Sequence, residues 1–70
     1  MPKMIYQGTV YFSGWANRRL FFPTREAAIE WATKEYEDDP AATEVWLTTI
    51  NTERTGSYGA LEIEENIQIL

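Results

Sequence analysis

Hydrophobic and aromatic residues first cluster in two short segments near the start of the chain. Residues 4–12 (MIYQGTVYF) are rich in β-branched and aromatic types, which favour β-strands, and the turn-forming pair Ser13 and Gly14 follows them. Residues 18–22 (RRLFF) resume the strand pattern after a short loop that contains Trp15. We therefore expect an antiparallel hairpin with Trp15 at its tip.

The next segment has the periodicity of an amphipathic helix. Pro23 ends the strand because it has no N–H for the ladder, and Thr24 can cap a helix by accepting a hydrogen bond from an early helical N–H. We expect the helix to run from Arg25 to about Asp38, before Pro40. One side of this helix is hydrophobic, and it consists of Ala28, Ile29, Trp31, Ala32 and Tyr36. The opposite side is polar, and it consists of Glu26, Glu30, Thr33 and Glu37.

Two further strands are predicted in the second half of the chain. Residues 44–50 (EVWLTTI) have apolar side chains on both faces, as in a central strand, and residues 51–57 read as a polar loop. From Leu61 onward the residues alternate, and the pattern predicts one apolar face made of Leu61, Ile63, Ile67 and Ile69. Glu65 falls on that same face. We expect either a β-bulge at Glu65 or a cation beside its carboxylate.

The order of these elements predicts a single domain over residues 1–70 of the α+β class. We expect a β-β-α-β-β fold, with a four-stranded, largely antiparallel sheet and one helix packed on a face. The chain has only 70 residues, near the lower limit for one stable core, but 44% of them are hydrophobic and 14% are aromatic. This composition supplies enough apolar surface for a folded core.

The residue types present exclude most catalytic chemistry. The chain has no cysteine and no histidine, so disulfides, thiolate catalysis, the usual zinc sites and a histidine base are ruled out. The four glycines are too scattered to form a phosphate-binding loop, and residues 37–40 (EDDP) lack the alternating ligands of a calcium loop. We therefore expect a non-enzymatic protein with no catalytic residue, no cofactor and no metal site.

The N-terminal residues give an expectation about location. They lack a basic segment followed by an apolar stretch of signal-peptide length, and no run of residues approaches the ~18 apolar positions of a membrane span. The absence of cysteine fits a reducing compartment. We expect a cytoplasmic protein without a membrane anchor.

Charged residues are sorted along the chain. Residues 1–25 contain four basic residues and no acid, whereas residues 26–70 contain all eleven acids and two basic residues. The net charge of −5 is therefore made of +4 in the first part and −9 in the second. A compact domain with this distribution attracts basic surfaces and repels nucleic acid.

Six residues are candidates for contact with a partner, in two acidic rows and one exposed aromatic position. The helix acidic row is Glu26, Glu30 and Glu37, and the strand acidic row is Glu62 and Glu64, which lie two apart on one strand face. Trp15 is a large ring in a polar loop and is the candidate aromatic contact beside either row. The alternative for each row is a solvated surface that only keeps the protein soluble.

One segment resembles a DNA-binding family. Residues 22–32 (FPTREAAIEWA), which follow a strand-turn-strand unit, are similar to the arm-type DNA-binding domains of tyrosine recombinases. In that family a short sheet leads through a Phe-x-Thr-x-x-x-Ala-x-x-Trp stretch into a helix, and the sheet enters DNA. The resemblance covers roughly residues 9–36 and implies a nucleic-acid contact through Arg18 and Arg19.

A second resemblance concerns the type of protein. A free-standing acidic α+β domain of 70 residues, without His or Cys and with several Tyr and Trp, is similar to small phage-encoded inhibitors of bacterial defence, including anti-CRISPR proteins. This resemblance implies that carboxylates occupy a surface on which a nucleic-acid-binding complex expects phosphates. It also implies a location in the cytoplasm of a host bacterium.

The sequence therefore favours a protein-interaction module, monomeric or homodimeric, that binds a partner with a basic surface and inhibits it. The expected partner is a nucleic-acid-binding complex, with no direct contact to nucleic acid and none to a membrane. Two alternatives stay open. One is a small nucleic-acid-binding module that uses Arg18, Arg19 and Arg25. The other is a structural or accessory subunit that assembles through a strand edge.

Overall fold

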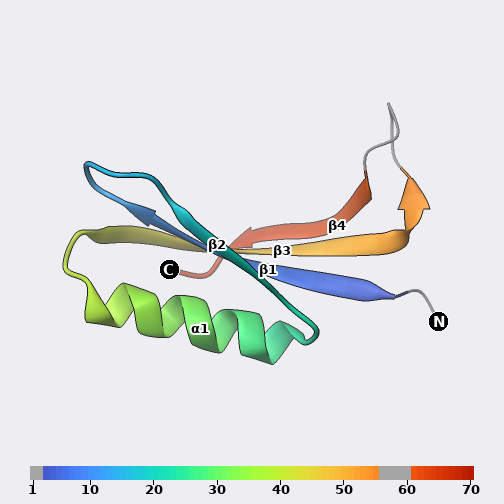
Figure 1. Ribbon diagram of the computed structural model, residues 1–70, viewed down its shortest axis with the longest axis horizontal. Coiled ribbons are helices and arrows are strands. Elements are labelled where there is room, and N and C mark those ends of the chain that lie inside the picture. The colour runs from blue at the N-terminus through green and yellow to red at the C-terminus, as the bar shows by residue number, and fades with distance from the viewer. Residues whose placement is uncertain (1–2, 56–60) are drawn as a thin grey trace.

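A computed structural model describes residues 3–55 and 61–70 and contains the five predicted elements in the predicted order (Figure 1). Their bounds are Met4–Phe12 (β1), Arg18–Phe22 (β2), Arg25–Asp38 (α1), Ala42–Thr55 (β3) and Leu61–Gln68 (β4). The strands form one sheet in the order β2-β1-β3-β4, and all neighbours are antiparallel. The predicted α+β class, with one helix beside a four-stranded sheet, is confirmed.

The start of α1 follows from the residues that precede it. Thr24 has extended backbone angles, with φ −129° and ψ 152°, and its hydroxyl accepts a hydrogen bond from the Ala27 N–H at 3.2 Å. This contact satisfies one of the N–H groups that a helix leaves without an internal partner. The predicted N-cap and the predicted helix range are both confirmed.

The helix lies very close to the backbone of β1. A Cβ atom at Gly8 would lie 2.9 Å from the carbonyl oxygen of Ala28 and 3.3 Å from the Cβ of Ala32. Both alanines are fully buried. The absence of side-chain atoms at Gly8 and the small size of the two alanines therefore set the distance between helix and sheet.

The core fills the space on either side of this contact. Val10 and Phe12 of β1 and Val45 of β3 are buried together with Ala32. These strand residues lie on the same sheet face as Gly8, because side chains two positions apart share a face. At the border of the core, the rings of Trp31 and Phe22 lie 5.8 Å apart. The predicted buried side of the helix is therefore confirmed.

The third strand is longer than its hydrophobic pattern predicts. It was expected to end at Ile50, but β3 continues to Thr55, and the polar Asn51 is only 1% exposed. Asn51 lies opposite Met4 of β1, and its amide donates a hydrogen bond to Glu64 Oε1 at 3.1 Å. Hydrogen bonding therefore keeps a polar residue inside the sheet. The rest of the predicted loop, residues 56 and 57, lies outside the described residues.

The predicted apolar face of the last strand is also corrected. The register of β3 and β4 passes from Thr49 opposite Glu65 to Ile50 opposite Ile63, so a β-bulge adds one residue to β4. As a result, Ile67 lies on the helix side, whereas Ile63 lies on the other side and is 59% exposed. The four residues Leu61, Ile63, Ile67 and Ile69 therefore do not share one face.

The bulge leaves the Glu65 carboxylate on the helix side of the sheet, where two contacts satisfy it. Its Oε1 atom accepts a hydrogen bond from the Thr49 hydroxyl at 3.2 Å and lies 3.5 Å from Arg25 Nε. The two expectations for this position, a bulge and a cation beside the carboxylate, are both fulfilled. The carboxylate on the helix side of the sheet has two partners, so it is not left unpaired.

Replacement of Gly8 by Ala tests the close approach of α1 to β1. We expect Gly8→Ala to lower the free energy of unfolding by about 1–3 kcal/mol, because the blocking atom is a backbone oxygen that cannot rotate away. Urea denaturation followed by circular dichroism measures this change. A variant as stable as the parent would contradict the observed helix position.

Matched substitutions on β4 test the bulge. We expect Ile67→Thr to destabilise the protein by about 1–2 kcal/mol, because Ile67 faces the helix side of the sheet, opposite Leu47. Ile63→Thr is the control and should change stability by less than about 0.5 kcal/mol, because this side chain is exposed. Equal losses at the two positions would indicate uninterrupted alternation instead of a bulge.

Candidate functional site

The helix acidic row is exposed along the outer side of α1. Glu26, Glu30 and Glu37 are all classed as exposed, and they lie on the side of the helix opposite the two buried alanines. Within the part of the chain that the structure describes, no ion pair or side-chain hydrogen bond engages them. These three carboxylates are therefore available to a partner.

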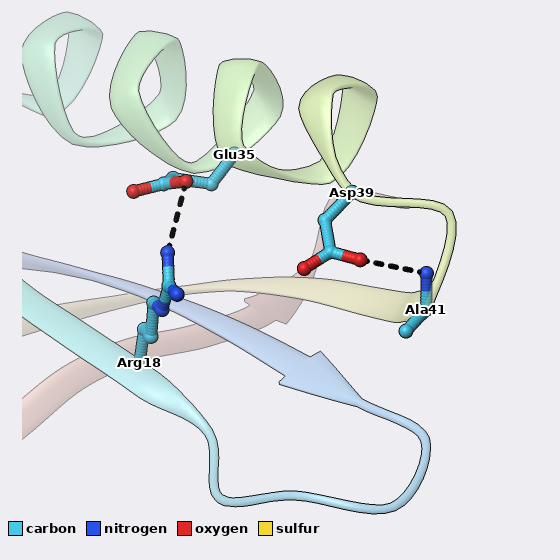
Figure 2. Close-up of polar contacts among 4 residues, drawn as sticks. All are labelled: Arg18, Glu35, Asp39 and Ala41. Carbon is cyan, nitrogen blue, oxygen red and sulfur yellow. Dashed lines mark hydrogen bonds and ion pairs between the residues drawn. The ribbon is translucent and has the colours of Figure 1, made fainter.

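Glu35, on the side of α1 that faces the sheet, is in an ion pair within the protein. Glu35 Oε2 lies 3.3 Å from Arg18 Nη1, and Figure 2 shows this ion pair joining β2 to the helix. The Arg18 guanidinium also lies over the Phe12 ring, 5.4 Å from its centre. The charge of Arg18 is therefore balanced within the protein and is oriented by an aromatic ring.

A second ion pair engages the arginine at the start of the helix. Arg25 Nε contacts the same Glu65 oxygen that accepts the Thr49 hydrogen bond. Both charged side chains are more than one third exposed, so the pair contributes little to stability. The pair matters for surface charge, because the Glu65 carboxylate offsets the positive charge of Arg25.

The strand acidic row makes contacts within the sheet. Glu64 accepts the hydrogen bond from the buried Asn51 amide, and Glu62 is half-buried opposite Asn51. Both residues therefore lie next to Asn51, near the region where β3 and β4 are irregular. The helix acidic row is the more accessible of the two predicted rows.

Trp15 lies in the loop between β1 and β2 and is 59% exposed. Its ring centre lies 6.2 Å from that of Phe12, so the exposed ring rests partly on the edge of the core. The turn before it requires Gly14, which has a φ of +92°. The loop is attached to the segment that follows α1, because the Ser13 N–H donates to the Ala41 carbonyl at 2.8 Å.

This attachment places Trp15 near the end of the helix. Figure 1 shows the β1–β2 loop and the C-terminal end of α1 at the same end of the molecule. The turn that connects α1 to β3 is held by Asp39, whose carboxylate accepts a hydrogen bond from the Ala41 N–H at 2.9 Å (Figure 2). The loop that carries Trp15 and the end of the helix acidic row therefore belong to one end of the protein.

The three arginines of the alternative DNA-binding site are not gathered in one patch. Arg18 lies opposite Val10 and faces the helix, whereas Arg19 lies opposite Thr9 and faces the other side of the sheet. Arg18 and Arg25 are both in ion pairs. Among these three, Arg19 alone has no ion pair within the described residues, so the described part of the chain does not bring the three arginines together.

Sequence reasoning missed a hollow on the sheet face opposite α1, which we call the open face. The hollow has a volume of about 200 Å³ and receives residues from all four strands. Arg19, Tyr11 and Trp46 supply its large side chains, and the remaining lining residues are uncharged and polar. The sequence of each strand taken alone does not indicate this hollow, because its lining residues come together only through the cross-strand register.

A second hollow, of about 530 Å³, lies where β1 begins and β2 ends. Its lining is mainly apolar and includes Met4, Ile5, Phe21, Phe22 and Pro23. Phe21 is 56% exposed, so this part of the surface has more apolar area than a charged solubilising face would have.

Some kinds of site are absent from the described part of the chain. Residues 3–55 and 61–70 contain no group of three or more Asp or Glu side chains placed to hold a metal ion. Nor does α1 have the length and apolar character that crossing a membrane would require.

Comparison with known proteins found no match. No family model matches the chain, and neither a curated protein nor a solved structure is similar to it.

Proposed function

We propose that this protein is a non-enzymatic interaction module that binds a basic protein surface through the outer side of α1. The observation that supports the proposal is that the carboxylate on the inner side of the helix is in an ion pair, whereas, within the described part of the chain, those on the outer side are not. Glu35, on the inner side, is paired with Arg18, whereas the helix acidic row has no cation partner among the described residues. Complementary charge raises the association rate and selects partners.

The proposed partner is a nucleic-acid-binding protein. Residues 26 and 37 are separated by about 16 Å along the helix axis, so the row presents several carboxylates in a line. Lysines and arginines that contact successive phosphates of a nucleic acid can contact such a line instead. A partner occupied in this way no longer binds nucleic acid, and its activity is inhibited, as in the phage-encoded inhibitors of bacterial defence that the chain resembles.

Trp15 is the proposed apolar contact beside this row. Charge pairs at an interface mainly affect the rate of association, whereas a large ring that becomes buried lowers the rate of dissociation. The Phe12 ring below Trp15 and the hydrogen bond from Ser13 to Ala41 hold the loop in place before binding. A loop ordered in advance costs less conformational entropy on association.

Charge-matched variants test the helix acidic row. The purified protein is used to capture binding proteins from a bacterial lysate, and mass spectrometry identifies them. One nucleic-acid-binding protein among them is then purified, and its rate of association with the parent protein and with each variant is measured. We expect E26Q/E30Q/E37Q to lower this rate constant about tenfold or more. The control E53Q/E62Q/E64Q makes the same change in net charge and should have a much smaller effect. Duplex DNA should compete with the protein for the partner.

Three outcomes would contradict this assignment. Equal losses of association rate for both triple variants would mean that the helix acidic row is not the specific contact. Binding that survives both triple variants but is lost in Trp15→Ala would mean that recognition is apolar. Simultaneous binding of the protein and DNA to the partner would exclude inhibition by occupation of the nucleic-acid surface.

Assembly through a strand edge is a second candidate function, and the exposure of β2 favours it. Leu20 and Phe21 on this edge strand are 48% and 56% exposed. Two copies of β2 paired antiparallel about Leu20 would place Arg19 of each copy opposite Phe21 of the other, with no like charges in register.

Light scattering over a range of concentrations tests this edge. We expect a dimer if β2 pairs, and Leu20→Lys should convert it to a monomer, because two ammonium groups would then face each other. A monomer at every concentration of the parent protein would rule out assembly through β2.

A further inference from the structure

We propose that the hollow on the open face of the sheet is a binding site for a mononucleotide. This site lies on the other side of the sheet from α1 and is independent of the helix acidic row. Its lining places a charged side chain, two aromatic rings and several polar groups close together.

The cross-strand register places the lining residues in two adjacent rows. In one row Thr9 of β1 lies between Arg19 of β2 and Trp46 of β3. In the next row Thr48 of β3 lies between Gln7 of β1 and Asn66 of β4. Tyr11 lies two positions beyond Thr9 on the same face of β1, opposite Glu44. A single ligand in the hollow therefore contacts residues of all four strands.

Arg19 gives the hollow a local positive charge on an otherwise acidic protein. No ion pair engages its guanidinium within the described residues, and no carboxylate lines the hollow. The nearest acid in the register is Glu44, opposite Tyr11, and it is not among the lining residues. A guanidinium binds phosphate with two parallel hydrogen bonds, so an anionic phosphate group is the ligand chemistry that fits this position.

The aromatic residues provide the second element of recognition. Trp46 is half-buried and Tyr11 is 39% exposed, so both rings are held by the sheet and still reach the solvent. A nucleobase stacks on such rings through its π face, with about 1–3 kcal/mol per stacked base. Arg19 lies in the same row as Trp46, so one nucleotide can place its base near Trp46 and its phosphate beside Arg19.

Amide side chains supply donors and acceptors for the edge of a base. The Thr48 hydroxyl donates to Asn66 Oδ1 at 2.8 Å, which fixes the Asn66 amide and leaves its Nδ2 hydrogens free to donate. Gln7 lies on the other side of Thr48 and has no hydrogen-bond partner for its side chain in the described part of the chain. Both amides can therefore bond to the polar edge of a stacked base.

The size and charge of the molecule limit the ligand to a single nucleotide. A hollow of about 200 Å³ has room for a base and part of a sugar, and the phosphate then lies outside it, beside the exposed Arg19 on the edge strand. A nucleic-acid strand would extend beyond the hollow over a protein of net charge −5, where the release of counterions by one arginine gives little affinity.

Nuclear magnetic resonance tests this site. The ¹⁵N-labelled protein is titrated with AMP, GMP, CMP and UMP, and the three tryptophan indole signals are followed. We expect saturable shifts of the Trp46 signal and of β1 and β3 amides, with the Trp15 and Trp31 signals unchanged. Adenosine, which lacks the phosphate, and ribose 5-phosphate, which lacks the base, should each bind at least about tenfold more weakly than the best nucleotide.

Neighbouring arginines on opposite faces of β2 give a matched control. Arg19→Gln should weaken nucleotide binding about tenfold or more, whereas Arg18→Gln, with the same change in charge, should leave it unchanged. Asn66→Ala is a second variant at an exposed position and should also weaken binding. The dispersion of the amide spectrum verifies that each variant is folded.

Four results would overturn the proposal. The first is the absence of any shift at about 10 mM nucleotide, and the second is equal nucleotide affinity of the Arg19→Gln and parent proteins. The third is equal affinity of the parent protein for a neutral monosaccharide and for the nucleotide. The fourth is tighter binding of a single-stranded oligonucleotide than of the mononucleotide at about 0.15 M salt. The third result would indicate a carbohydrate site, and the fourth a platform for a nucleic-acid strand.

Discussion

The close contact between α1 and the backbone of β1 at Gly8 determines how the helix, the core and the charged side chains are arranged. A glycine in the sheet and two alanines in the helix bring the two elements together without long side chains between them. The core of so short a chain can then be built mainly from Val10, Val45 and Leu47. Within the described residues α1 covers one face of the sheet, and no other helix or strand covers the opposite face (Figure 1).

The charge distribution in space follows from this arrangement. Inner charges of the helix are balanced across the contact, since Arg18 pairs with Glu35 and Arg25 pairs with Glu65. The remaining helix carboxylates point outward, and within the described residues no ion pair engages them. The open face carries aromatic and polar side chains with Arg19 as the cation of its hollow. The two sides of the molecule therefore differ in their surface chemistry.

Local sequence signals predicted the elements that depend on local interactions. The range of α1, its Thr24 cap, its buried side and the bounds of β1 and β2 all follow from periodicity, capping and turn residues. The length of β3 did not follow, because Asn51 stays in the sheet through its hydrogen bond to Glu64, which lies 13 residues later in the chain. A contact between distant residues leaves no local signal.

The bulge in β4 and the hollow on the open face also depend on contacts between residues that are distant in the sequence, so local patterns did not fully predict them. Glu65 indicated an irregularity, but only the register with β3 decides that Ile63 leaves the apolar face. Arg18 is in an ion pair on the helix side of the sheet, whereas the adjacent Arg19 lines the hollow on the other side. Alternation along a strand predicts that they face opposite sides, and the packing of α1 decides which side is which.

Carboxyl footprinting of the protein bound to a purified partner shows whether the helix acidic row is the contact surface. Carbodiimide-driven labelling, read by mass spectrometry, reports how accessible each carboxylate is in the free and bound states. The account predicts that labelling of Glu26, Glu30 and Glu37 falls on binding, whereas labelling of Glu44, which lies opposite Tyr11 on β3, does not change. Protection of Glu44 or of the strand acidic row, with the helix acidic row still fully labelled, would contradict it.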